Sequence, residues 1–155
     1  MTVTGVDVEL GRAAVALDGA ERVALVCHVN PDPDALGSAL GLAGFLRNRG
    51  KEVVCSWGNE PFEPPAWMAA LEWAGFVVPP AEFPSEPGVL VALDTASPDR
   101  LGTLAGRAQR AREVIVLDHH RTNAGFGTIA VIDPEASSTA ELVFRLVERM
   151  GGELP

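Results

Sequence analysis

The chain has 155 residues, about the length of one domain, and 47% of them are apolar while 21% are charged. This composition excludes low-complexity disorder and is typical of a globular protein with a buried core. Acidic residues outnumber basic ones by 21 to 12, giving a formal net charge of −9, which disfavours a surface that holds long duplex DNA by neutralising its phosphates.

The cysteine content and the length of the apolar runs indicate the cellular compartment of the protein. Cys27 and Cys55 are too few for a disulfide framework, and because both lie within apolar runs we expect two reduced, buried thiols. No apolar run approaches the ~20 residues that a membrane span needs. The stretch from Met1 to Leu17 contains acids and lacks the basic region of a signal peptide. We therefore expect a cytoplasmic protein with no membrane partner.

The first part of the chain alternates helical and strand-like patterns. A continuous apolar run predicts a strand buried on both faces over 22–27, and a second strand is expected over 52–57. Between them we expect a helix over 34–49 that Gly50 ends. Apolar residues at helical spacing predict an amphipathic helix before the first strand: Val6, Leu10, Ala13, Ala14 and Leu17.

The proline-rich middle of the chain gives a weaker pattern. Over 58–87 we expect loops around one short helix near 66–73 and a strand at 76–78. A strongly apolar run then predicts a buried strand over 88–93. The helix that follows is expected to be capped by Ser97, with proline at its first position.

The last part of the chain completes the alternation. Strands are predicted over 113–117 and 128–132, and a final helix over 138–150 has Ser138 and Glu141 in capping-box spacing. Strands alternating with helices predict an α/β fold, a doubly wound and mostly parallel sheet with helices on both faces.

Ionisable side chains follow four of the predicted strands. In an open parallel sheet these positions share one edge, where ligands bind. All three histidines of the chain are in this set, each beside carboxylates. The residues are His28, Asp32 and Asp34 after the strand at 22–27, Asp94 after the strand at 88–93, Asp118, His119 and His120 after the strand at 113–117, and Asp133 after the strand at 128–132.

The chemical interpretation of this set is metal binding. Mixed histidine and aspartate ligands favour a borderline ion such as Mn²⁺ over Mg²⁺. Two ions typically ~3.5–4 Å apart generate hydroxide from water and clamp a phosphoryl group for in-line attack. The spacing of His28, Asp32 and Asp34 lets one loop serve both ions, and Asp94 from a central strand could bridge them.

Simpler interpretations exist for the separate features. A single aspartate after a strand is usually an N-cap or turn residue, and this remains open for Asp34, Asp94 and Asp133. The glycines at 37, 41 and 44 do not form a dinucleotide-binding motif, and neither a P-loop nor a nucleophile elbow occurs. The three tryptophans are more typical of packing than of base stacking. It is the joint placement of the four groups that favours a metal site.

The motifs together resemble a known family. The run His28-x-Asn30-Pro31-Asp32-x-Asp34-Ala35-x-Gly37-Ser38, followed by Asp94-Thr95 and Asp118-His119-His120, resembles the DHH phosphoesterase family. The run Ser137-Ser138-Thr139-Ala140-Glu141 is similar to its nanoRNase/pAp-phosphatase branch, whose members degrade very short oligonucleotides and dephosphorylate 3′-phosphoadenosine 5′-phosphate. The resemblance extends from about residue 5 to residue 150.

The resemblance implies a role for each site residue. One Mn²⁺ would bind His28, Asp32 and Asp94, and a second would bind Asp34, Asp94 and His119, so that Asp94 bridges the two ions; Mg²⁺ and Co²⁺ are alternatives. His120 would contact the substrate phosphate or assist the leaving oxygen. Asp118 would orient its neighbours without binding metal.

Two features of the family are missing from the 155 residues. One is a further aspartate in a Thr-Asp-Thr-Gly-like motif beyond the helix that ends near Met150, for which Asp133 is not the equivalent. The other is a C-terminal DHHA1 domain with a glycine-rich, nucleotide-binding motif. The resemblance thus implies that residues 1–155 form a DHH domain that stops before its last motif, with one metal ligand lacking.

The expected activity is Mn²⁺-dependent hydrolysis of small nucleotides or short single-stranded RNA, by hydroxide attack on phosphate. Two alternatives are a pyrophosphatase or exopolyphosphatase of the same family and a metal-binding module without turnover. The sequence does not determine the oligomeric state, and a homodimer is possible.

Overall fold

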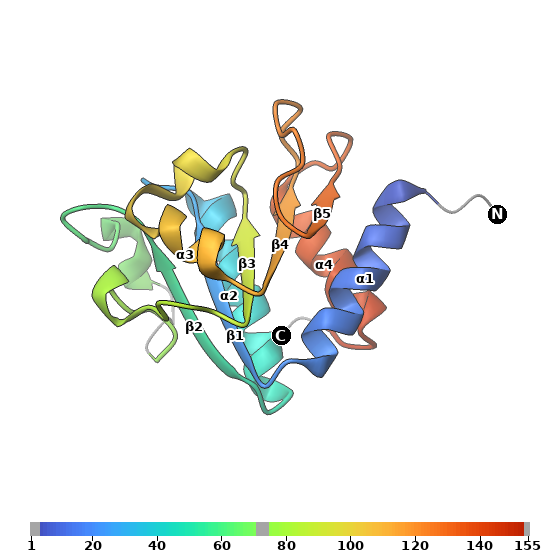
Figure 1. Cartoon of the computed structure of the whole chain (residues 1–155), viewed down its shortest axis with the longest axis horizontal. Coiled ribbons are helices and arrows are strands. Elements are labelled where there is room, and N and C mark those ends of the chain that lie inside the picture. The colour runs from blue at the N-terminus through green and yellow to red at the C-terminus, as the bar shows by residue number, and fades with distance from the viewer. Residues whose placement is uncertain (1–3, 71–74, 154–155) are drawn as a thin grey trace.

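A parallel sheet forms the centre of the molecule. The computed structural model describes residues 4–70 and 75–153. Its five parallel strands lie in the order β2-β1-β3-β4-β5 (Figure 1). The strand order reverses between β1 and β3, which is the point at which ligands bind in open α/β sheets. The strands are β1 (Arg22–Cys27), β2 (Glu52–Trp57), β3 (Val89–Leu93), β4 (Glu113–Asp118) and β5 (Ile129–Ile132).

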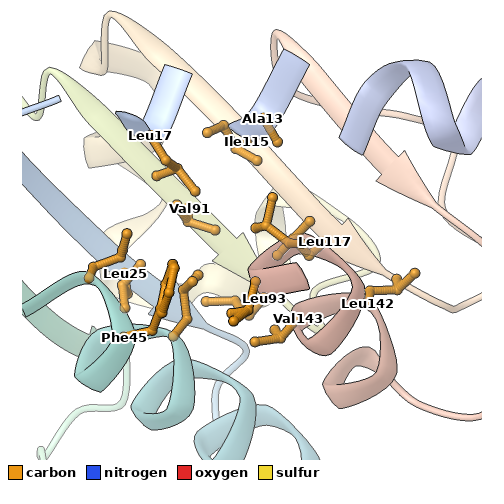
Figure 2. Close-up of a cluster of buried hydrophobic side chains, with 14 of the residues drawn as sticks. Ala13, Leu17, Leu25, Phe45, Val91, Leu93, Ile115, Leu117, Leu142 and Val143 are labelled. Atoms are coloured by element: carbon orange, nitrogen blue, oxygen red, sulfur yellow. The ribbon is translucent and has the colours of Figure 1, made fainter. Parts of the chain in front are cut away.

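Helices cover both faces of the sheet, as predicted. One face packs against α1 (Gly5–Gly19), α2 (Pro33–Asn48) and α4 (Thr139–Arg149), and its core contains Leu17, Leu25, Phe45, Val91, Leu117 and Val143 (Figure 2). The opposite face packs against η3 (Pro98–Leu104), a 3-10 helix, and α3 (Ala105–Arg110). Both faces of the strands are therefore buried, which explains why the strands are continuous apolar runs.

Side chains from α1 cover the outer edge of β5. The Glu9 carboxylate accepts a hydrogen bond from the Ala130 amide at 2.9 Å. Arg12 pairs with Glu9 at 2.7 Å and donates to the Thr128 carbonyl at 3.3 Å. At the other edge, the Cys55 amide donates to Phe76 O at 2.8 Å. These contacts satisfy backbone groups that would otherwise be free to pair with another chain.

The middle of the chain has less regular structure than predicted. The strand predicted at 76–78 is only an isolated parallel bridge between Cys55 and Val77. The short helix predicted near 66–73 is a 3-10 helix, η1 (Ala66–Ala70), and its expected end lies outside the described residues. A further 3-10 helix, η2 (Pro80–Glu82), follows.

The helix after β3 also differs from the prediction. It is 3-10 in form over Pro98–Leu104, because Gly102 has φ 57° and ψ −129°, a conformation that interrupts a helix. Ser97 is its N-cap residue but makes no capping bond, since its hydroxyl donates to the Asp99 carboxylate.

The capping box predicted for the last helix is half formed. The Ser138 hydroxyl accepts a hydrogen bond from the Glu141 amide at 3.2 Å. The Glu141 carboxylate, however, accepts from the amide and hydroxyl of Ser137, at 2.7 and 2.8 Å, and not from the Ser138 amide. The helix therefore still begins at Thr139 with its N-cap in place.

The two cysteines are buried, as predicted, and burial raises the pKa of Cys55 to about 12. Trp57 is buried in the core, Trp67 is 38% exposed, and Trp73 lies outside the described residues. No helix in the described part of the chain is long and apolar enough to cross a membrane.

We expect the contact between α1 and the sheet to contribute strongly to stability. Leu17 is fully buried whereas Val15, on the same helix, is 75% exposed. Leu17→Ala should lower the free energy of unfolding by about 2–5 kcal/mol, because it leaves a cavity in the core. Val15→Ala, the matched control, should change it by less than about 0.5 kcal/mol. Urea unfolding measures both, and equal effects would contradict this role for α1.

Candidate metal centre

His28 is the first residue after β1 and is nearly buried. Its Nδ1 lies 2.7 Å from the Val29 carbonyl, which can only accept, so Nδ1 carries a proton and Nε2 is the nitrogen that faces the carboxylates. Nε2 lies 3.4 Å from Asp94 Oδ2 and 3.8 Å from Asp32 Oδ1. One ligand atom from each of these three residues lies within 4.8 Å of the others, as a single metal ion requires.

The loop that carries His28 is fixed to the loops that follow β2 and β3. Asn30, at φ 52°, exchanges two hydrogen bonds with Asn59: its amide donates to Asn59 Oδ1 at 2.8 Å, and Asn59 Nδ2 donates to Asn30 Oδ1 at 2.7 Å. The Val29 amide donates to the Arg100 carbonyl at 2.9 Å. Three strand ends are thereby tied together beside the site.

A close approach of two glycines makes this arrangement possible. A Cβ atom on Gly58 would clash with the Leu101 carbonyl, and one on Gly102 would lie 2.5 Å from the Gly58 carbonyl. The Thr103 amide uses the same approach to donate to Gly58 O at 3.1 Å. Side chains at either glycine would force the loops after β2 and β3 apart.

Asp32 and Asp34 lie at the beginning of α2. Asp32 is the N-cap residue, and its Oδ1 accepts from the Ala35 amide at 2.9 Å. Asp34 reaches the beginning of α4 instead, where its two oxygens accept from the amides of Thr139 and Ala140, each at 3.1 Å. The capping role left open for Asp34 is therefore real, but it serves α4 and not its own helix.

Asp94 follows β3, is 3% exposed, and has φ 57°, which is uncommon for a residue other than glycine. Its Oδ2 lies 3.4 Å from His28 Nε2, while its Oδ1 lies 3.5 Å from His119 Nε2 and accepts from the Thr139 hydroxyl at 2.9 Å. The two oxygens of one buried carboxylate therefore face two different histidines.

The pKa values at Asp94 follow from these contacts. Burial by itself raises the pKa of Asp94, but the bonds from His28 and Thr139 outweigh it, so that the pKa lies below the usual value. The bond to Asp94 in turn raises the pKa of His28. Asp94 is therefore ionised at neutral pH, as a metal ligand must be.

Asp118, the last residue of β4, is fully buried. One of its oxygens lies 2.6 Å from His120 Nδ1, and the other accepts from Asn123 Nδ2 at 2.8 Å. The same Asn123 nitrogen donates to the Thr95 carbonyl at 3.1 Å. Asp118 thus holds the His120 ring, and Asn123 holds Asp118 and joins the loops after β3 and β4.

A second compact group contains Asp94, His119 and His120. The predicted second set had Asp34 in place of His120. The structure brings Asp34 Oδ2 within 3.6 Å of His119 Nε2, but the compact group includes His120 instead. Asp94 belongs to both compact groups, and their mixed imidazole and carboxylate donors fit a borderline divalent ion.

Asp133 belongs to neither compact group among the described residues. Its carboxylate accepts from the Glu135 amide and from Arg145, each at 3.0 Å. The turn interpretation is therefore correct for Asp133. Thr139 and Asn123, which contact the site, were not predicted as site residues; Thr139 lies in the Ser-Ser-Thr-Ala-Glu run, whereas no sequence signal indicated Asn123.

Known proteins are similar to this chain in sequence. Over 129 residues the chain is 36% identical to the bifunctional oligoribonuclease and PAP phosphatase NrnA of Thermus thermophilus, covering 83% of this chain and 37% of that protein. It is 30% identical to the cyclic-di-AMP phosphodiesterase GdpP of Geobacillus thermodenitrificans, covering 83% of this chain and 21% of that protein.

A solved structure agrees with these similarities. An exopolyphosphatase-related protein from Bacteroides fragilis has a TM-score of 0.83 and 30% identity to this chain, covering 93% of this chain and 44% of that one. The family model described as "DHH family, N-terminal domain" matches residues 22–155. The chain therefore belongs to the DHH family, and the matched part is its N-terminal domain.

Proposed function

We propose that this chain holds two divalent metal ions, Mn²⁺ first among them, and acts in the hydrolysis of phosphate esters in small nucleotides. The observation that supports this most directly is the Asp94 carboxylate, whose two oxygens lie 3.4 and 3.5 Å from the Nε2 atoms of His28 and His119. A buried carboxylate between two sets of ligands can be shared, which offsets the repulsion between neighbouring cations.

His28, Asp32 and Asp94 would hold one ion, and Asp94 and His119, with Asp34, would hold the other. When bound, a pair of such ions supplies Lewis acidity to a phosphoryl oxygen and lowers the pKa of water. The Val29 carbonyl holds the Nδ1 proton of His28, so Nε2 is the nitrogen that would lose its proton and bind metal. The amides at the beginning of α4 hold Asp34 in place.

His120 has a different role in this proposal. Its side chain is 43% exposed, and Asp118 holds Nδ1 at 2.6 Å. This contact keeps the ring fixed, so that Nε2 is available to contact a substrate phosphate or to donate a proton to the leaving oxygen. Asp118 acts only through His120 in this scheme.

The proposed substrates are 3′-phosphoadenosine 5′-phosphate and short oligoribonucleotides, because these match the name of the Thermus relative. The likeness to an exopolyphosphatase-related protein favours polyphosphate or pyrophosphate as the second candidate. This chain matches only 37% and 44% of the lengths of those two proteins. We propose that, in those two proteins, residues outside the matched part also help to select the substrate.

Replacing Asp94 should remove both ions. In Asp94→Asn the affinity for Mn²⁺ should fall by more than about 100-fold at both sites. Losing the hydrogen-bond partner of a metal ligand already costs about 10–100-fold in affinity, and here a ligand shared by both ions is lost. Titration calorimetry measures this, with Asp133→Asn as the matched control at another strand end. One ion bound by the unaltered chain would indicate a half-built site at His28, Asp32 and Asp94. No binding by the folded chain would contradict the proposal.

Replacing His120 should separate metal binding from turnover. We expect His120→Asn to lower kcat by about 10²–10⁴-fold, because a positioned acid or phosphate contact is lost. The affinity for Mn²⁺ should stay within about threefold of the unaltered chain, since His120 supports neither ion directly in this scheme. A loss of Mn²⁺ affinity equal to that of Asp94→Asn would instead identify His120 as a metal ligand.

Substrate comparison tests the proposed class. With Mn²⁺ present, phosphate release from 3′-phosphoadenosine 5′-phosphate and cleavage of a diribonucleotide should each be faster than release from pyrophosphate. EDTA should abolish turnover, and added Mn²⁺ should restore it, because the ions supply the Lewis acid. Faster hydrolysis of pyrophosphate would favour the second candidate. Metal binding without turnover of any of the three would indicate a metal-binding module.

A further inference from the structure

Helix α4 begins against two of the proposed metal ligands. Its first residue, Thr139, is fully buried. The Thr139 amide donates to Asp34 Oδ2 at 3.1 Å, and its hydroxyl donates to Asp94 Oδ1 at 2.9 Å. One residue therefore binds carboxylates that lie 105 and 45 positions earlier in the chain.

The two bonds differ in what they require of the sequence. The bond to Asp34 comes from the backbone, so any residue other than proline could supply it. The bond to Asp94 needs a hydroxyl, which only serine or threonine places there. The branched Cβ of threonine also restricts the hydroxyl to few rotamers, and burial restricts it further.

The hydroxyl is not needed to begin the helix. Ser138 is the N-cap residue of α4, and its side chain already accepts from the Glu141 amide at 3.2 Å. Thr139 lies one position beyond the cap, where a hydroxyl has no capping function. The interaction of its hydroxyl with Asp94 therefore needs a reason other than helix stability.

We infer that Thr139 is a positioning residue: its hydroxyl holds the Asp94 carboxylate in the orientation in which Oδ1 faces His119 and Oδ2 faces His28. The inference rests on the proposed function, because it concerns how Asp94 is shared between two ions. Without this bond the buried carboxylate can rotate about its Cβ–Cγ bond, and binding must then restore the bridging orientation. Oδ1 also lies 3.9 Å from His120 Nδ1, so a rotated carboxylate would meet that ring differently.

Three substitutions separate the hydroxyl from the rest of the residue. Thr139→Val keeps the shape and the amide bond to Asp34 but removes the hydroxyl. Thr139→Ser keeps the hydroxyl. Ser138→Ala is the matched control, since it removes the cap of the same helix and touches neither carboxylate.

The readouts are Mn²⁺ affinity by titration calorimetry and the EPR spectrum, which distinguishes a spin-coupled pair from isolated ions. Thr139→Val should weaken binding of both ions by about 10–100-fold, the usual effect of losing a partner of a metal ligand, and should reduce the coupled signal. Thr139→Ser should bind within about threefold of the unaltered chain. Ser138→Ala should lower the melting temperature without changing affinity.

Several results would overturn this inference. Unaltered Mn²⁺ affinity in a folded Thr139→Val chain is one, and binding by Thr139→Ser as weak as that by Thr139→Val is another. Equal weakening in Ser138→Ala would assign the effect to the helix end. If circular dichroism shows that Thr139→Val is unfolded, Thr139→Ala and Thr139→Ser, which differ only in the hydroxyl, make the same comparison. Failure of the unaltered chain to bind Mn²⁺ would overturn the proposed function itself, a result distinct from those above.

Discussion

The arrangement of the site depends on one buried carboxylate. Asp94 is 3% exposed, and removing a charge from water is costly unless the charge is paired and hydrogen-bonded. Here the Thr139 hydroxyl and the His28 and His119 rings surround it. Its φ of 57° adds backbone strain, which persists only where the surrounding structure fixes the residue. Both the strain and the buried charge are explained if the carboxylate is held ready to bind cations.

The sheet topology brings the partners of Asp94 together. β1 and β3 are neighbours although β2 lies between them in the chain, so His28 and Asp94 directly follow adjacent strands at the point where the strand order reverses. β4 pairs with the other side of β3 and places His119 beside the same carboxylate. α2 and α4 lie on one face of the sheet, which lets Asp34 reach the first amides of α4. Residues distant in sequence therefore meet because each lies at or next to the end of a strand or helix, and these ends share one edge of the sheet.

The sequence predicted the elements whose apolar pattern is set by burial alone. The strands over 22–27 and 52–57 were predicted with their observed ends, because both faces of each strand are covered. The proline-rich segment over 58–87 has no regular apolar pattern, and its structure depends on contacts with β2 and η3. The strand-end acids and histidines were predictable from topology. The contact of Thr139 with Asp94 was not, because it depends on how α4 packs onto the sheet.

Charge balance explains how so acidic a site can exist in the folded chain. Asp32, Asp34 and Asp94 gather in a protein of net charge −9, and unopposed carboxylates would repel one another and any phosphate. The beginnings of α2 and α4 carry partial positive charge, and their backbone amides donate hydrogen bonds to Asp32 and Asp34 respectively. Divalent ions bound there would reverse the local potential. Because the rest of the chain is predominantly acidic, the carboxyl edge of the sheet would then be the place where an anionic nucleotide is attracted.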